Sequence, residues 1–364
     1  MYSKVEQAFI VNFYYNQDEL YLAEDDLKEC EMLAMTAGVQ IIMKENIHLR
    51  NIDSAYFITR GKLEIIKYKV KDHKINVLIV NKELKPVQVR NLEEYLKVKV
   101  IGRTELILDI FAQHARTSEA KIQVELAQLR YLLPRLTGYG ILLSRLGGGI
   151  GTRGPGETKL EYDRRHILRR ISTLQKKLKD IEKHHQVISK NRTMKVVTLV
   201  GYTNAGKTTL FNALTHENLK TGNSLFVTLD PTIRKVSLDN EQNFILLSDT
   251  VGFIKELPHS LVASFKATLS EVKNSDLVLH VIDIQDRNIE AKIKTVEEVI
   301  AELGLEVRHS VIVFNKIDKM KDQGKITRFT NLYPESVFVS AREKINIDNL
   351  KKIILIKAGK NNGL

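Results

Sequence analysis

Apolar and polar positions change their spacing along the chain, and the first pattern covers residues 1–112. Compact apolar runs of strand length occupy 8–13, 39–43, 75–80 and 98–101. Amphipathic stretches with helical spacing lie between them, at 19–37, 61–70 and 86–96. This alternation predicts a small N-terminal α/β domain in which helices cover a parallel sheet.

Between 113 and 193 the apolar positions follow helical spacing on both sides of a glycine-rich loop at 147–156. The first set is Ile122, Leu126, Leu129, Leu133 and Leu136. The second set, spaced alternately by four and by three, is Ile167, Ile171, Leu174, Leu178 and Ile181. Each stripe needs an apolar surface to cover it, so we expect an antiparallel helical hairpin.

Residues 194–364 return to short apolar runs separated by helical stretches. The runs lie at 196–200, 244–247, 277–282, 310–314 and 336–339. This spacing predicts a doubly wound α/β domain. We therefore expect three parts in the chain, namely 1–112, 113–193 and 194–364.

Composition places the chain among folded proteins of a reducing compartment. The apolar fraction is 43%, which is ordinary for a globular protein. Cys30 is the single cysteine, so no intramolecular disulfide can form. Because the sequence has neither a signal-like start nor an apolar run of about 18 residues, we expect a cytoplasmic protein without a transmembrane segment.

The net charge is concentrated in the helical part. Residues 116–195 hold 18 lysines and arginines against 7 aspartates and glutamates, while the whole chain carries a net charge of +12. A basic region of this kind is typical of proteins that bind a polyanion. We expect the glycine-rich loop, with Arg153, to contact a phosphate backbone. The alternatives are a solvated helix face and a flexible connector.

Residues 201–208 match the phosphate-loop pattern G-x-x-x-x-G-K-[ST], after an expected strand and before an expected helix. They are Gly201, Tyr202, Thr203, Asn204, Ala205, Gly206, Lys207 and Thr208. Backbone N–H groups of such a loop surround phosphates. We expect Lys207 to reach the β and γ oxygens and the Thr208 hydroxyl to coordinate Mg²⁺.

A second motif follows the strand expected at 244–247. It consists of Asp249, Thr250, Val251 and Gly252. An aspartate at a strand end can hold Mg²⁺ through a water molecule. Since Gly252 has no Cβ, its backbone amide can approach a γ-phosphate closely.

A third motif follows the strand expected at 310–314 and predicts recognition of guanine. It consists of Asn315, Lys316, Ile317 and Asp318, and the later pair Ser340 and Ala341 is expected to support the base. The Asp318 carboxylate can accept hydrogen bonds from guanine N1–H and N2–H₂, a donor pair that adenine lacks. The motif therefore predicts GTP in preference to ATP.

A switch segment is expected between the first two motifs, where a hydroxyl must reach Mg²⁺ and the γ-phosphate. The segment consists of Phe226, Val227, Thr228, Leu229 and Asp230. Thr228 is our candidate for that hydroxyl and Thr232 is its rival. A threonine that binds only when the γ-phosphate is present creates an order–disorder switch.

Two positions shape the expected mechanism. Phe253 stands where many GTPases have a glutamine that orients the attacking water, so we expect slow intrinsic hydrolysis that depends on a partner. The Asn204 side chain could hold a K⁺ ion near the β and γ phosphates, and the alternative is a hydrogen bond that stabilises the loop. Lys207, Thr228 and Gly252 are the expected catalytic residues.

With these motifs the chain resembles the HflX family of translational P-loop GTPases, within the Obg–HflX group. The resemblance spans nearly the whole sequence and is most specific at 151–161, at the switch segment 226–230 and at Phe253. It implies a monomeric GTPase that binds GTP and GDP and whose glycine-rich loop approaches RNA of the large ribosomal subunit. It also implies a role in splitting or rescuing ribosomes. The chain departs from many members in stopping at Leu364, so we expect a short form without their additional C-terminal domain.

Two other functions remain open on the residues alone. The chain could be an RNA-remodelling ATPase in which the basic hairpin does the work, although Asp318 argues against ATP. It could also be a signalling or scaffolding GTPase that binds a protein effector.

Overall fold

The computed structural model divides into two compact units. The first comprises Met1–Gln113 with Val124–Gln175, and the second comprises His114–Gln123 with Lys176–Leu364. The residues that the structure describes are 6–145, 155–190, 192–217, 219, 222, 225–226, 228, 231–239, 243–255, 270–302, 309–320 and 322–359. Within these ranges, none of the helices combines the length and the apolar character that a membrane crossing needs.

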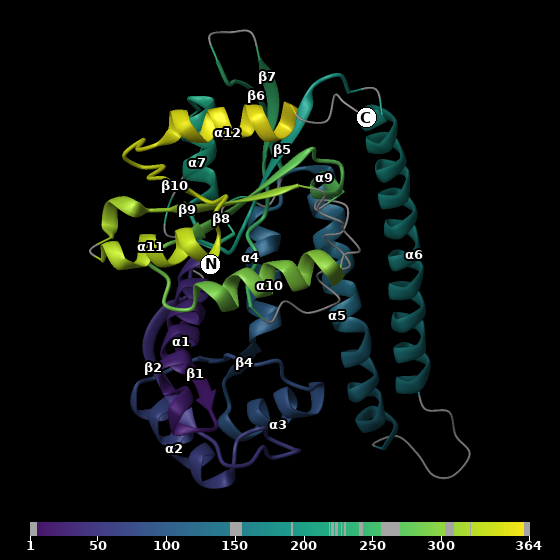
Figure 1. Ribbon diagram of the computed structural model, residues 1–364. Coiled ribbons are helices and arrows are strands. Elements are labelled where there is room, and N and C mark those ends of the chain that lie inside the picture. The colour runs from purple at the N-terminus through teal and green to yellow at the C-terminus, as the bar shows by residue number, and fades with distance from the viewer. Residues whose placement is uncertain are drawn as a thin grey trace. The chain divides into compact units, whose positions relative to one another are not determined.

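The first unit contains a four-stranded sheet with the order β2-β1-β3-β4, in which all neighbouring strands are parallel (Figure 1). Its elements in chain order are β1 (Gln7–Tyr14), η1 (Gln17–Glu19), α1 (Leu20–Thr36), β2 (Gln40–His48), α2 (Arg60–Asp72), β3 (Val77–Val80), α3 (Pro86–Leu96), β4 (Lys99–Gly102) and α4 (Arg103–His114). The predicted parallel sheet with covering helices is confirmed.

Alternate side chains of these strands build the core of the first unit. Phe9, Val11, Leu78 and Val80 are fully buried on one face, where residues of α2 and α3 pack against them. This is the arrangement expected for strands that are apolar on both faces. Two features differ from our expectation: β2 continues to His48, and α4 follows β4 directly.

Two long helices form the predicted hairpin, α5 (Ser118–Arg145) and α6 (Pro155–Lys190). They lie side by side and run in opposite directions (Figure 1). Leu126 and Leu174 are almost fully buried, and a two-pronged ion pair joins Arg170 to Glu125 at 2.6 and 2.8 Å.

The prediction that the glycine-rich loop extends to residue 156 is wrong. Pro155 and Gly156 belong to the first turn of α6, because proline is favoured at a helix start. The remainder of the loop, with Arg153, lies outside the described residues.

The second unit is built on a six-stranded sheet with the order β10-β9-β8-β5-β7-β6, parallel except for the antiparallel edge strand β6. Its further elements are β5 (Lys195–Val200), α7 (Lys207–Thr215), β6 (Thr232–Ser237), β7 (Phe244–Asp249), α9 (Ser270–Lys273), β8 (Leu277–Asp283), α10 (Ile289–Glu302), β9 (Ser310–Asn315), η2 (Ile317–Lys319), α11 (Gln323–Leu332), β10 (Val337–Phe338) and α12 (Ile347–Gly359).

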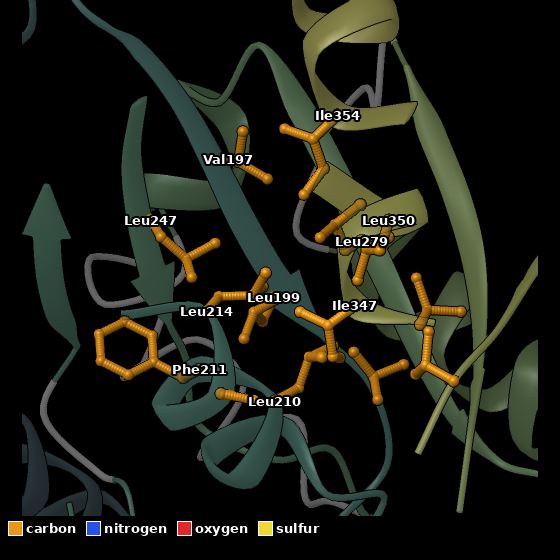
Figure 2. Packing of buried hydrophobic residues seen from close by; sticks show 14 of the residues in the cluster. Val197, Leu199, Leu210, Phe211, Leu214, Leu247, Leu279, Ile347, Leu350 and Ile354 are labelled. Atoms are coloured by element: carbon orange, nitrogen blue, oxygen red, sulfur yellow. The ribbon is translucent and has the colours of Figure 1, made fainter. Parts of the chain in front are cut away.

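Helices cover both faces of this sheet, so the doubly wound prediction is confirmed. On one face, residues of α7 and α12 pack on the central strands, as Phe211, Leu350 and Leu279 illustrate (Figure 2). On the other face, residues of α10 and α11 pack around Ile282 and Phe314. The two layers fix the carboxyl ends of the parallel strands, where the predicted motifs lie.

Candidate nucleotide-binding site

The phosphate loop connects β5 to α7, and two of its glycines are required by its path. Gly201 has a φ of +153°, and a Cβ there would lie 2.2 Å from the Val281 carbonyl oxygen. Gly206 has a φ of +91°, and a Cβ there would lie 2.3 Å from Asn315 Nδ2. The loop can therefore pass close to β8 and β9 only with glycine at these positions.

Lys207 begins α7 and is buried, with 6% of its surface exposed. Its ammonium group donates hydrogen bonds to the backbone oxygens of Gly201 and Tyr202, at 3.0 and 2.9 Å. Burial, assisted by the charge of Lys316, lowers the pKa of Lys207 to about 8, although Asp249 acts in the opposite direction. An anion beside this ammonium would relieve the cost of burying it.

Three oxygen atoms from separate segments meet beside the start of α7. Thr208 Oγ1 donates to Asp249 Oδ2 at 2.8 Å, and Thr228 Oγ1 donates to the same oxygen at 3.0 Å. The two hydroxyl oxygens are themselves 3.0 Å apart. Adjacent ligands of an octahedral Mg²⁺ ion, bound at about 2.1 Å, are separated by about 3 Å, so the two hydroxyl oxygens fit such an ion, and Asp249 Oδ2 holds both of them in place.

Asp249 is also suited to a cation. It is fully buried, and its Oδ1 atom has no hydrogen-bond partner among the described residues. Burial raises the pKa of Asp249, while Lys207 and the two threonine hydroxyls oppose that rise. The rival candidate Thr232 begins strand β6, so the structure brings Thr228, and not Thr232, to the other two oxygens.

The guanine motif is joined to the phosphate loop by side-chain hydrogen bonds. Asn315 Nδ2 donates to the Ala205 carbonyl at 3.0 Å, and Asn315 Oδ1 accepts from the Ala341 amide at 3.0 Å. Lys316 Nζ donates to the Asn204 carbonyl at 2.7 Å and pairs with Asp283 at 2.7 Å. Side chains of the guanine motif therefore tie it to the phosphate loop.

Asp318 is held by a partner whose role the sequence did not indicate. Ser340 Oγ donates to Asp318 Oδ1 at 2.5 Å, and the same hydroxyl accepts from the Glu343 amide at 3.1 Å. The bond fixes one carboxylate oxygen and thereby orients the other. An oriented carboxylate in this position can accept from two adjacent N–H donors of a base.

A cavity of about 430 Å³ connects these groups. Predicted site residues that line it are Thr203, Asn204, Gly206, Lys207, Thr208, Phe226, Thr228, Thr250, Gly252, Asn315, Lys316 and Asp318. Four lining residues were not predicted, namely Thr209, Gly222, Lys319 and Arg342. Arg342 directly follows Ser340 and Ala341, so its position in the motif was the signal that could have identified it.

The other predicted residues support the cavity or lie outside the description. Val251 is buried, and the Ile317 amide donates to the Val339 carbonyl at 3.3 Å. The Thr250 hydroxyl donates to the Leu199 carbonyl at 2.7 Å, which ties the second motif to β5. Val227, Leu229 and Asp230 lie outside the described residues.

Comparison with known families agrees with this geometry. Residues 24–112 match the model "GTP-binding GTPase N-terminal", and 114–192 match "GTP-binding GTPase Middle Region". Residues 196–316 match the model described as "50S ribosome-binding GTPase".

Individual relatives resemble the chain over most of its length. It is 48% identical to GTPase HflX of Caldanaerobacter subterraneus subsp. tengcongensis over 334 residues, which are 91% of this chain and 76% of that protein. It is 42% identical to GTPase HflX of Escherichia coli over 353 residues, which are 96% and 82% of the two chains. A GTP-binding protein from Sulfolobus solfataricus, solved in complex with GDP, superposes with a TM-score of 0.52 at 28% identity, over 98% of this chain and 99% of that one.

Proposed function

Since the chain belongs to the HflX family and is a GTP hydrolase, we propose that it binds the large ribosomal subunit and hydrolyses GTP there. Ribosome splitting or rescue during translation, in the cytoplasm and by a monomer, is the role that we propose for this cycle. The three parts 1–112, 113–193 and 194–364 would divide the work between an N-terminal domain, an RNA-binding hairpin and the GTPase. The observation that carries the proposal is the cavity lined by the phosphate loop, the Thr208 and Thr228 hydroxyls and Asp318, with Asp249 bonded to both hydroxyls.

Within that cavity, the chain's own residues are assigned as follows. Lys207 binds the β and γ phosphates, and Gly252 offers its backbone amide to the γ-phosphate. The hydroxyls of Thr208 and Thr228 hold Mg²⁺, and Asp249 holds it through water. When bound, the ion neutralises charge that develops on the phosphate oxygens. Asp318, oriented by Ser340, selects guanine.

Phe253 supports a dependence on the ribosome. It is 1% exposed and carries no group that could orient water, so the residue after Gly252 cannot act as glutamine does in other GTPases. We propose that the ribosome supplies the group that completes the site, and that K⁺ near Asn204 assists it.

The helical hairpin supports an RNA partner. Besides Arg170, which is paired with Glu125, the exposed basic side chains of α6 in the described part of the chain include Arg164, Arg165, Arg169, Lys176, Lys177, Lys179 and Lys183. Phosphate contacts by such residues are lost as salt rises, because counterions return to the RNA. Binding to the ribosome is therefore expected to weaken steeply with ionic strength.

A GTPase assay with purified large subunits tests the proposal. We expect hydrolysis to rise at least tenfold when subunits are added, and to be faster in potassium than in sodium. The matched control is Tyr68→Phe, at an exposed tyrosine of α2, which should respond as the wild type does. Hydrolysis that does not respond to the subunits would contradict the ribosomal role. If ATP displaced labelled GTP about as well as unlabelled GTP does, the ATPase interpretation would be favoured.

A further inference from the structure

The backbone after Gly252 is hydrogen-bonded to the phosphate loop. The Phe253 amide donates to the Gly201 carbonyl at 3.1 Å, and the Thr203 amide donates to the Phe253 carbonyl at 2.7 Å. Tyr202 and Phe253 thereby form an isolated parallel β-bridge. This bridge lies beyond the last register pairs of β5 and β7, so it extends their pairing into the site.

The Tyr202 side chain adds a third bond to this bridge. Its hydroxyl accepts a hydrogen bond from the Lys255 amide at 2.9 Å, although Tyr202 itself belongs to the phosphate loop. The ring is 7% exposed, and Lys292 Nζ lies 4.7 Å from its centroid, within the range of a cation–π interaction. Lys292 is in turn held by Asp286 at 2.6 Å.

These bonds determine where Gly252 lies. A Cβ on Gly252 would be 3.0 Å from Lys207 Nζ and 2.9 Å from Thr203 Cγ2, so the glycine backbone is already against the phosphate-binding lysine. Phe253 directly follows Gly252 and Lys255 is two positions further along, and both residues are bonded to the phosphate loop. A shift of this segment would therefore move the Gly252 amide away from the position of a γ-phosphate.

We propose that Tyr202 is a positioning residue for GTP hydrolysis, which places the Gly252 amide by holding the Phe253–Lys255 segment on the phosphate loop. The proposal rests on the nucleotide site assigned above. Tyr202 acts through Gly252, so its effect is confined to ligands that carry a γ-phosphate. Lys292 contributes by fixing the ring that carries the hydroxyl.

The test is Tyr202→Phe in the full chain, which keeps the ring and removes the hydroxyl. One neutral hydrogen bond is lost, so we expect single-turnover GTP hydrolysis and affinity for a non-hydrolysable GTP analogue each to fall about fivefold. Affinity for GDP should change less than about twofold, because GDP does not reach Gly252. Lys292→Met should move the same two quantities by about twofold.

Tyr333→Phe is the matched control, since Tyr333 packs on Phe314 and Phe329 in the same unit, away from the bridge. We expect wild-type values from it. Unchanged analogue affinity and hydrolysis in Tyr202→Phe would overturn the proposal. An equal loss of GDP and analogue affinity would also overturn it, by indicating general damage to the loop. A wild-type chain that bound no GDP would instead overturn the nucleotide site itself.

Discussion

The two sheets of this protein both gather polar side chains toward the carboxyl ends of their parallel strands, but they use them differently. In the four-stranded sheet, the polar side chains are paired with one another. In the six-stranded sheet, they surround a cavity and are incompletely compensated. Since the carboxyl ends of parallel strands are the usual place for a ligand, position alone does not distinguish the two cases.

The network of the four-stranded sheet is closed in the sense that each of its side chains is paired with another member, although the Arg103 Nε atom has no hydrogen-bond partner among the described residues. Asn12 Nδ2 donates to Asn46 Oδ1 at 2.9 Å, and Asn81 Nδ2 donates to Asn12 Oδ1 at 2.9 Å. Arg103 donates to Asn81 Oδ1 at 2.8 Å and pairs with Glu29. Each side chain in this chain of contacts has a partner from another element, so the network stabilises the domain without a ligand.

The cavity of the six-stranded sheet lacks this balance. Burial lowers the pKa of Lys207 to about 8 and raises that of Asp249. Asp249 Oδ1 has no hydrogen-bond partner among the described residues. Groups that are buried at a cost and shifted in pKa mark a site that a ligand completes. In the four-stranded sheet, the buried polar groups find their partners within the chain. In the six-stranded sheet, a ligand must supply the missing partners.

Lys207→Met should have the largest effect of the substitutions, and this effect should be on the cavity of the six-stranded sheet. We expect affinity for GTP and GDP to fall on the order of 10³-fold, because about two charge-assisted hydrogen bonds to phosphate, each of about 1.5–3 kcal/mol, are lost. The unliganded fold should lose less than the nucleotide affinity does, since the desolvation cost of the buried Lys207 charge is removed together with its attraction to Asp249. Equilibrium binding and thermal unfolding of the free protein measure both quantities. Retained nucleotide affinity would refute the role of Lys207.

Arg103→Met should show the reverse pattern. It leaves the Glu29 carboxylate, 12% exposed, without its guanidinium partner, which should destabilise the N-terminal domain by about 3 kcal/mol. GDP affinity should not change. Hydrogen exchange of peptides from β1 and β3 isolates this domain from the other unit.

The matched control for Arg103→Met is Lys44→Met, which removes a more exposed pair between Lys44 and Glu31 in the same unit. Such a surface pair contributes about 0–1 kcal/mol, so exchange should change little. If both substitutions accelerated exchange equally, the closed network would have no special part in stability. If Arg103→Met weakened GDP binding, the polar network of the first unit would not be independent of the nucleotide site.

Sequence patterns located the cavity because its motifs are local. Lys207, Asp249, Asn315 and Asp318 each stand at a fixed place after an apolar run, and parallel strands bring their carboxyl ends together. The choice of Thr228 over Thr232 rests on the resemblance of the switch segment 226–230 to the HflX family. The closed network offers no such string, since Asn12, Asn81 and Arg103 are far apart in the chain and become partners only through the fold.

Other features escaped prediction for physical reasons. Helix α4 buries Leu106, Ile107, Leu108, Ile110 and Phe111, so its apolar run has no clear helical period. The bond from Ser340 to Asp318 depends on how η2 and β10 meet. The bridge between Tyr202 and Phe253 depends on how closely the backbone of the phosphate loop approaches Phe253, and the spacing of motifs in the sequence does not determine that approach.

The smallest expected effect is a pH dependence of stability that arises from His280, in β8. Its imidazole is buried near the Lys207 charge, so it reports how far the charge of the cavity extends. Burial, with the Lys207 charge, lowers its pKa from the ordinary 6.5 to about 4. Between these values the unfolded chain binds a proton that the folded chain does not, so stability falls as pH falls from 6.5 towards 4. From pH 7 to pH 5 the loss of stability amounts to about 2 kcal/mol.

His280→Gln should remove this loss of stability, as measured by hydrogen exchange of β8 and β9 at both pH values. His309→Gln, at an exposed histidine, should leave the loss unchanged. Bound GDP should also reduce it, since its phosphates offset the charge of Lys207. An acid response that His280→Gln left unchanged would show that the cavity's uncompensated charge does not extend to this histidine.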